Sequence, residues 1–160
     1  KGLNMLRLSP HAPMPVGQLR ENRISSIKLV NVGLKTMDIM LLAEWLKLNT
    51  SVTVVDLSDN HIQYDALKAL SYALTANTSI TSLSLRGNPC CEKPASKLSR
   101  EMMLPITKAY ELFAKALTTN RTLETLNMQS QTIPIDAFQG MEMIDLSVDE
   151  AKYQGLPPFH

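Results

Sequence analysis

A repeat of 28 residues is the feature of this sequence that most restricts its fold. Three segments starting at Ile24, Val52 and Ile80 align at this spacing, and a fourth starts at Leu123, 43 residues after the third. Each segment has apolar residues at its first, fourth and sixth positions. An asparagine recurs three residues before the next apolar start, at Asn49, Asn77 and Asn120. Because both halves of the unit keep the same offset, we expect a stack of structural repeats.

Each repeat joins a strand pattern to a helix pattern. Apolar and polar residues alternate through Leu83, Ser84 and Leu85, which predicts a short strand with one buried face. Between Tyr64 and Thr75 the apolar residues recur at intervals of three and four, which predicts an amphipathic helix. Residues 37–48 and 110–117 have the same helical spacing. Strands alternating with helices at a short period predict an α/β fold in which parallel strands are covered by helices.

The ends and one interior segment depart from the repeat. We expect a single domain over residues 1–160, with strand starts near residues 3, 24, 52, 80, 123 and 141 and an irregular tail over 147–160. Prolines at 10, 13 and 15 predict an extended connection after the first strand. The strand near 141 follows Leu123 by only 18 residues, so it is either a cap or preceded by residues missing near 134–140. An insertion at about 89–105 is interpreted as a solvated surface loop, with a partner-binding arm as the alternative.

The repeats resemble those of leucine-rich repeat proteins of the ribonuclease-inhibitor-like class, over roughly residues 24–133. The resemblance implies a leucine-rich repeat solenoid, or horseshoe, with parallel strands on the concave face and helices on the convex face. It also implies that Asn60 and Asn88 hydrogen-bond the backbone in the bend after each strand. The resulting row of hydrogen bonds, or ladder, should be weaker in the first and fourth repeats, where Val32 and Gln131 occupy the position of this asparagine. Axonemal and other cytoskeletal subunits are among the proteins with similar repeats.

Asn49, Asn77 and Asn120 each begin an Asn-x-Ser/Thr sequence, which is the acceptor pattern for N-glycosylation. All three follow a predicted helix, where asparagine tolerates the left-handed backbone that ends many helices. We therefore interpret them as structural caps.

Charge and residue inventory argue against several classes of function. Sixteen basic and 15 acidic residues give a net charge of +1, which disfavours a nucleic-acid partner. No apolar run is long enough for a membrane span and no export signal is evident, so we expect an intracellular, cytoplasmic protein, with the cytoskeleton or cilium suggested by the resemblance. The adjacent Cys90 and Cys91 cannot link distant segments. Without metal-ligand spacing, a glycine-rich loop or a clustered reactive set, we expect no metal, no cofactor and no enzyme activity.

The exposed face of the predicted sheet is the remaining candidate site. The side chains expected on it are Ser26, Lys28, Val54, Asp56, Ser58, Asp59, Ser84, Arg86, Asn127 and Gln129. We expect a non-catalytic scaffold that binds other proteins, as a structural or assembly subunit of a larger complex such as a ciliary or cytoskeletal assembly. The alternatives are a regulator of a small GTPase, similar to a GTPase-activating protein, and the repeat domain of an intracellular immune receptor. A face that is simply solvated is the remaining possibility.

Overall fold

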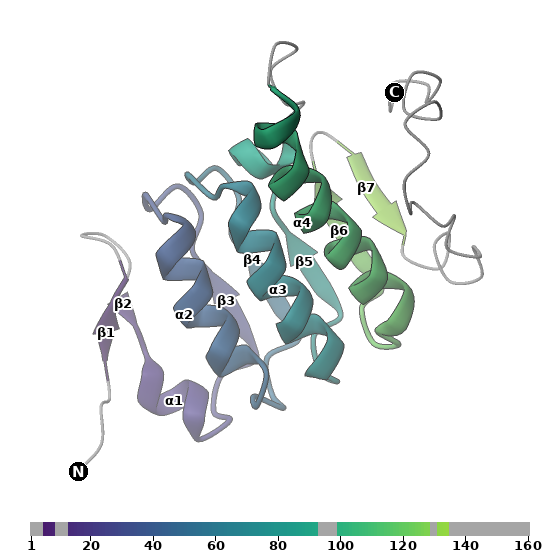
Figure 1. Cartoon of the computed structure of the whole chain (residues 1–160). Coiled ribbons are helices and arrows are strands. Elements are labelled where there is room, and N and C mark those ends of the chain that lie inside the picture. Colours follow the sequence, from purple (N-terminus) through teal and green to yellow (C-terminus); the bar gives the residue numbers. More distant parts are fainter. Residues whose placement is uncertain (1–4, 9–12, 93–98, 129–130, 135–160) are drawn as a thin grey trace.

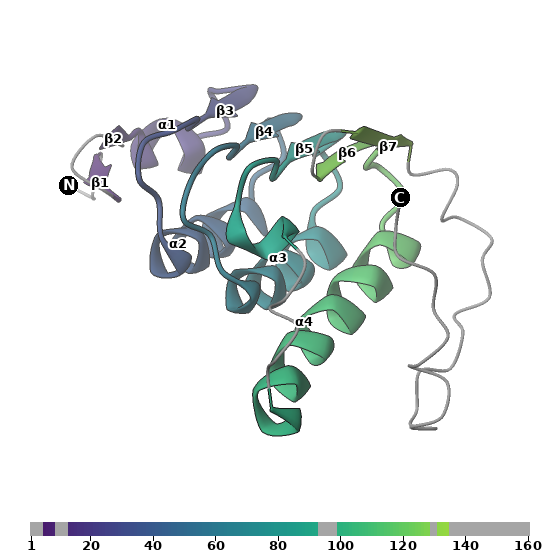
Figure 2. The ribbon, with the colours of Figure 1, turned by 90° about the horizontal axis from the view of Figure 1, so that it is seen from above.

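The chain forms a parallel sheet with helices on one face. A computed structural model describes residues 5–8, 13–92 and 99–128, together with the backbone of 131–134. The main sheet has the order β3-β4-β5-β6-β7, with β3 (Ser26–Lys28), β4 (Val54–Asp56), β5 (Ser82–Ser84) and β6 (Thr125–Met128) parallel. Equivalent repeat positions pair across neighbouring strands, as in Lys28, Asp56, Ser84 and Asn127. Helices α2 (Thr36–Leu46), α3 (Tyr64–Ala76) and α4 (Arg100–Thr119) lie side by side on the other layer (Figures 1 and 2).

The core lies between the two layers and is built from the repeat's apolar positions. In α3 every residue expected to face inward is buried, namely Ala66, Leu67, Leu70, Ala73 and Leu74. The fourth position of each strand is also buried, at Ile27, Val55, Leu83 and Leu126. Burying such side chains is worth about 1.5–3 kcal/mol for each large aliphatic residue. Stacking therefore supplies the burial that one strand and one helix cannot achieve alone.

A first asparagine ladder holds the bends after the strands. The Asn60 side-chain amide donates to the carbonyls of Leu29, one repeat earlier (2.7 Å), and of Leu57 (2.9 Å). Its oxygen accepts from the backbone N–H of Leu34 at 3.0 Å. Asn88 makes the equivalent bonds one repeat later. Each asparagine therefore ties its own bend to the preceding repeat.

A second ladder joins the helix ends. The Asn77 amide donates to the carbonyls of Leu46 (2.7 Å) and Asn49 (2.9 Å), and its oxygen accepts from the N–H of Ile80 at 2.8 Å. Asn49 and Asn120 bond in the same way to the helix end one repeat before them. The expected left-handed cap is wrong, because none of the three has a positive φ. Their side chains instead join neighbouring repeats, because each amide donates to backbone carbonyls at the preceding helix end.

The N-terminal end differs from the expected strand and extended connection. The first strand, β1 (Leu6–Arg7), pairs antiparallel with β2 (Pro13–Met14) and lies outside the main sheet. A short helix, α1 (Val16–Arg20), follows Pro15 directly. Proline is unfavourable inside a helix but is tolerated at its start, so Pro15 limits where the helix begins without preventing it.

The insertion is only partly a loop. A short 3₁₀ helix, η1 (Pro89–Cys91), follows β5, and α4 already begins at Arg100, so residues 100–105 are helical. Pro105 lies within α4, although it cannot donate to the carbonyl of Glu101. Ser99 caps the helix by accepting from the Met102 N–H at 3.4 Å. Residues 100–105 of the insertion therefore lengthen a helix, whose first turns project past its neighbours in Figure 2.

The last repeat ends in a hairpin. β7 (Gln131–Pro134) turns back antiparallel to β6, so Gln131 lies in a strand and not in an asparagine-type bend. Glutamine is one methylene longer than asparagine and places its amide differently, so the bend of the other repeats is not reproduced. The strand expected at 141–146 and the tail over 147–160 lie outside the residues that the structure describes.

Candidate functional site

The face of the sheet that no helix covers carries most of the predicted partner-binding residues, and we call it the open sheet face. Ser26, Lys28, Asp59 and Arg86 are exposed, Val54, Asp56, Ser84 and Asn127 are half-buried, and Ser58 is buried. Gln129 lies outside the described residues. The strands bring these side chains together because positions 3 and 5 of each repeat lie in register across β3 to β6. Strand geometry places both positions opposite the buried fourth position.

The centre of the open sheet face is a fixed hydroxyl–carboxylate network. The Ser58 hydroxyl lies 2.6 Å from the Asp56 carboxylate and 2.7 Å from the Ser84 hydroxyl. The Ser58 backbone N–H also donates to Asp56, at 3.1 Å. Ser58 is therefore occupied in fixing its neighbours and is not presented to a partner. Sequence alternation alone could not reveal this, since the bonding partner Ser84 lies on the next strand.

The bend after the strands presents an exposed ion pair. Arg86 and Asp59 approach to 3.7 Å, and both side chains are largely solvated. The Asp59 backbone is left-handed, with φ of 57°, and its N–H donates to the Arg86 carbonyl at 2.7 Å. Gly87 has φ of 69° and lies against the Asp59 carboxylate. A Cβ atom at this position would collide with that carboxylate. Arginine is enriched among residues that dominate binding energy at protein interfaces, and Arg86 is the arginine on this face.

Asn127 has an unused hydrogen-bonding group. Its side-chain oxygen is buried and has no hydrogen-bond partner among the described residues. Asn127 pairs with Ser84 across β5 and β6. Buried polar atoms are normally satisfied, so this oxygen is a place where a partner's donor would be favourable.

The two cysteines are not poised for reaction. Both are buried, with their sulfurs 3.8 Å apart. The hydrogen bond to Cys91 and burial raise the pKa of the Cys90 thiol far above its usual range. Tyr110 donates its hydroxyl to the Cys90 carbonyl at 2.8 Å and packs edge-on against Tyr64; burial raises the Tyr110 pKa as well. A thiol held protonated is a poor nucleophile.

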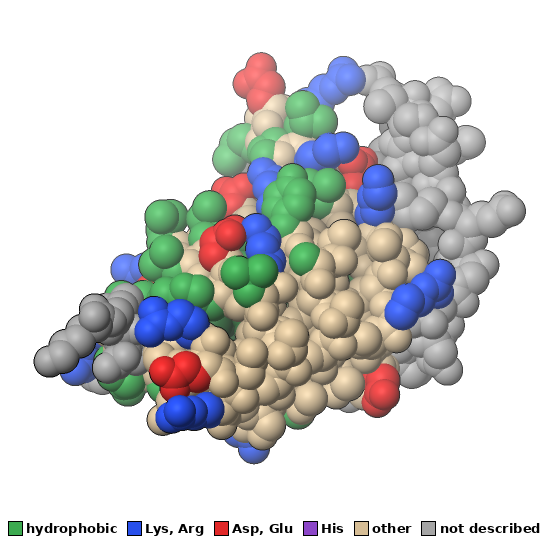
Figure 3. Space-filling view, turned by 90° about the horizontal axis from the view of Figure 1, so that it is seen from below, with side chains coloured by type: hydrophobic (Ala, Val, Ile, Leu, Met, Phe, Trp, Pro, Cys, Tyr) green, Lys and Arg blue, Asp and Glu red, His purple; other side chains and the backbone are tan. Residues whose placement is uncertain are grey.

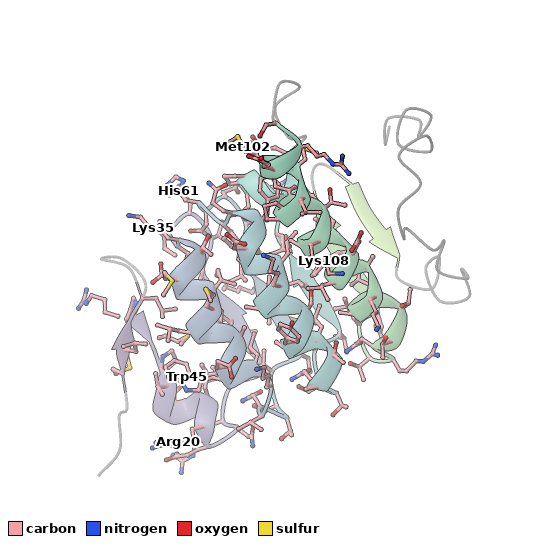
Figure 4. The ribbon with its side chains drawn as sticks, viewed as in Figure 1. Arg20, Lys35, Trp45, His61, Met102 and Lys108 are labelled. Carbon is pink, nitrogen blue, oxygen red and sulfur yellow. The ribbon has the colours of Figure 1, made fainter. Side chains whose placement is uncertain are left out.

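Other reactive groups are dispersed in the part of the chain that the structure describes. No group of three or more His, Cys, Asp or Glu side chains there has the arrangement of a metal site. His61 is exposed and lies beside Lys35 in the segments leading to the helices, away from the open sheet face (Figure 4). None of the described helices is long and apolar enough to cross a membrane.

Helix α2 carries an apolar outer side that the sequence interpretation missed. Met37 and Met40 on this helix are 66% and 42% exposed. Leu41 and, just after the helix, Leu48 are also exposed, as is Tyr72 on α3. Figure 3, which views the molecule from below, shows hydrophobic side chains interspersed with charged ones. The spacing of residues 37, 41 and 48 by four and seven places these side chains on one side of a helix, and this pattern in the sequence could have indicated an exposed apolar side.

Comparison with known proteins identifies one strand–helix unit of this chain as similar to a known repeat family. A family model described as "Leucine Rich repeat" matches residues 48–71, while no curated protein matches the chain. Among solved structures, the chain is similar to one described as "Leiomodin-1 Actin-Binding Site 2 (ABS2)", with 19% sequence identity and a TM-score of 0.49 over 71% of this chain and 76% of that one. Residues 48–71 span β4 and the first part of α3, which is one strand–helix unit. The family match and the repetition of this unit along the chain support a leucine-rich repeat protein.

Proposed function

We propose that the chain is a non-catalytic protein-binding scaffold whose open sheet face contacts the partner. The observation that carries this proposal is the fixed, uncovered row of polar side chains on parallel strands, centred on the Asp56–Ser58–Ser84 network and ending at Arg86. Preorganised side chains lose little conformational entropy on binding, which favours association. Lys28 and Arg86 provide positive charge, and Asp56 and Asp59 provide negative charge. The partner is therefore a protein segment with mixed, complementary charge.

The finer assignments belong to the same proposal. They are the ribonuclease-inhibitor-like class, the horseshoe shape, and a role as an assembly subunit in a cytoskeletal or ciliary complex. The repeat period and the resemblance of the repeats support them. A GTPase regulator or an immune-receptor domain would use the same type of surface, so the identity of a captured partner separates these alternatives.

Affinity capture with paired variants tests the proposal. Wild-type protein, Arg86→Ala and Lys115→Ala are compared as baits in native extract, because both substitutions remove an exposed cation but only Arg86 lies on the open sheet face. Truncating a central anchor typically weakens binding by about 2 kcal/mol, or roughly 30-fold. We expect Arg86→Ala to lose the partner and Lys115→Ala to retain it. Partners that are retained equally by both variants would place the binding surface elsewhere.

A further inference from the structure

Strand β3 is an edge of the main sheet. Within the described residues it has a strand neighbour only on its β4 side. The bonds between β3 and β4 use odd-numbered residues of the β3 segment, as in the Leu29 N–H that donates to the Asp56 carbonyl. Backbone groups alternate in direction along a strand, so the N–H and C=O groups of Ser26 and Lys28 point away from β4. Such an edge is a template for another strand.

The side chains along the β3 edge are more exposed than their counterparts one repeat later. Lys28 is exposed, whereas Asp56, at the same position of β4, is half-buried. Val30 is 41% exposed, and Ser58 at the equivalent position is 5% exposed. In Figure 2, α1, β1 and β2 are displaced from the row of strands toward the helix layer. The cap therefore leaves the β3 edge accessible to a strand that continues the row.

The apolar residues beneath this edge are incompletely covered. Ile24 and Leu29 are half-buried, although they occupy the first and sixth positions of the repeat. Their equivalents in the next two repeats are at most 2% exposed, at Val52, Leu57, Ile80 and Leu85. An added strand with apolar side chains on its core side would complete this part of the core surface.

The added element is a single strand and not another complete repeat. In the interior, an asparagine reaches back to the preceding repeat at two places, after the strand and after the helix. In the first repeat these places are held by Val32 and Glu21. Valine has no polar side-chain group, and Glu21 is directed into an exposed ion pair with Arg23. Neither ladder can continue past β3, whereas backbone pairing of one strand needs neither asparagine.

Charge at this end of the molecule favours an acidic partner. Residues 5–8 and 13–38 hold two acidic side chains and five basic ones, which are Arg7, Arg20, Arg23, Lys28 and Lys35. Both acidic side chains are engaged, because Glu21 pairs with Arg23 at 3.2 Å and Asp38 accepts from the Lys35 backbone N–H at 2.8 Å. Lys28 forms no ion pair in the part of the chain that the structure describes. Complementary charge selects among partners, so acidic segments are preferred here.

We propose that the β3 edge binds an extended, acidic segment of a partner protein as an added strand. The backbone of that segment bonds the outward-pointing groups of Ser26 and Lys28. Its apolar side chains cover Ile24 and Leu29, while its acidic side chains lie on the open sheet face beside Lys28. Opposite charges on adjacent strands stabilise such pairing, and the backbone bonds supply affinity that does not depend on side-chain identity.

Synthetic peptides test this binding in the full 160-residue chain. The probe is a short, end-blocked, fluorescein-labelled peptide of alternating glutamate and valine, and its fluorescence anisotropy is measured against protein concentration. We expect saturable binding, and weaker binding of the corresponding lysine–valine peptide. A glutamate–valine peptide methylated at every amide keeps its charge but cannot donate backbone hydrogen bonds, so it should not bind. A parent peptide that fails to bind, or a methylated one that binds equally well, overturns the proposal.

Variants of the protein locate the site at the β3 edge. Lys28→Glu should weaken binding of the glutamate–valine peptide by roughly 2- to 30-fold, because it replaces attraction by repulsion, and it should strengthen binding of the lysine–valine peptide. Lys115→Glu makes the same charge change on α4 and should have no effect. Ser26→Pro removes an outward N–H that β4 does not use, so it should abolish binding, whereas Ser26→Ala should retain it. Circular dichroism and the urea midpoint check that Ser26→Pro is folded, and Lys28→Glu tests the site independently of it.

Arg86→Ala separates this site from the contact proposed for the open sheet face. Arg86 follows β5, two strands away from the β3 edge, so its removal should leave peptide binding unchanged even where partner capture is lost. Peptide binding that Arg86→Ala abolishes would place the peptide on the open sheet face and overturn the edge proposal. Binding that is insensitive to Lys28→Glu, or equally weakened by Lys115→Glu, would overturn it as well.

Discussion

Removing the Asn77 side chain tests whether the second ladder holds the repeats together. Asn77 is 2% exposed and bonds two carbonyls, of Leu46 and Asn49, and two backbone N–H groups, of Ser79 and Ile80, all within 2.9 Å. Asn77→Ala leaves these four groups without their partner in a site that water does not reach.

The expected cost follows from these four bonds. Each hydrogen bond contributes about 0.5–1.5 kcal/mol net, so losing four costs about 2–6 kcal/mol. Domains of this size are typically stable by about 5–15 kcal/mol, so the substitution should remove a large part of the total. We expect a loss near the middle of the range, about 4 kcal/mol, because strand and helix ends relax only partly.

Urea unfolding measures this loss in the free energy of unfolding. Circular dichroism and the fluorescence of Trp45, the only tryptophan, should give coincident transitions. Asn127→Ala is the matched control, because the Asn127 side-chain oxygen has no hydrogen-bond partner in the described structure. It should cost less than about 1 kcal/mol. If Asn77→Ala and Asn127→Ala reduce stability equally, the ladder does not stabilise the stack as argued.

Two further predictions concern a glycine bend and a buried thiol. Gly87→Ala should cost more in free energy of unfolding than Gly33→Ala in urea titrations. Both glycines have positive φ, which costs a residue with a side chain about 1–2 kcal/mol. Only the methyl group of Gly87→Ala would also collide with the Asp59 carboxylate. Equal losses for the two variants would exclude this collision. The raised pKa of Cys90 keeps its thiol neutral in the folded state, while the unfolded thiol ionises above its ordinary pKa of about 8.5. The unfolded state then binds fewer protons, so stability should fall as pH rises above about 8.5, and more steeply than in Cys90→Ala. Parallel pH profiles of the two proteins would contradict this assignment.

The repeat positions predicted the core because they depend only on periodicity. Ala66, Leu67 and Leu70 were identified from spacing along one helix, and all three are buried. Position 4 of each strand follows from the alternation of side chains and needs no information about neighbours. Local pattern was sufficient wherever the fold repeats the same environment at each period.

Local rules failed where the partner lies in another repeat. The asparagine at 77 was assigned a left-handed cap from its position after a helix, but its bonding partners lie 28 and 31 residues away. Ser58 was expected to face a partner, but the Ser84 hydroxyl on the next strand holds it. Residues 100–105 were expected to lie in a surface loop, yet they belong to α4, which packs on α3 and continues through Pro105. Each of these depends on contacts that single-sequence spacing does not contain.

The two ladders also separate the stability of this protein from its proposed binding. Asn60 and Asn77 are buried and bond backbone groups in neighbouring repeats, so they set the spacing of the strands. Arg86 projects from that frame, and its exposed ion pair contributes little to folding. Arg86→Ala should therefore abolish partner capture with little change in the urea midpoint. Asn77→Ala should lower the midpoint and weaken capture together, since the row of side chains on the open sheet face keeps its register only while the ladder is intact.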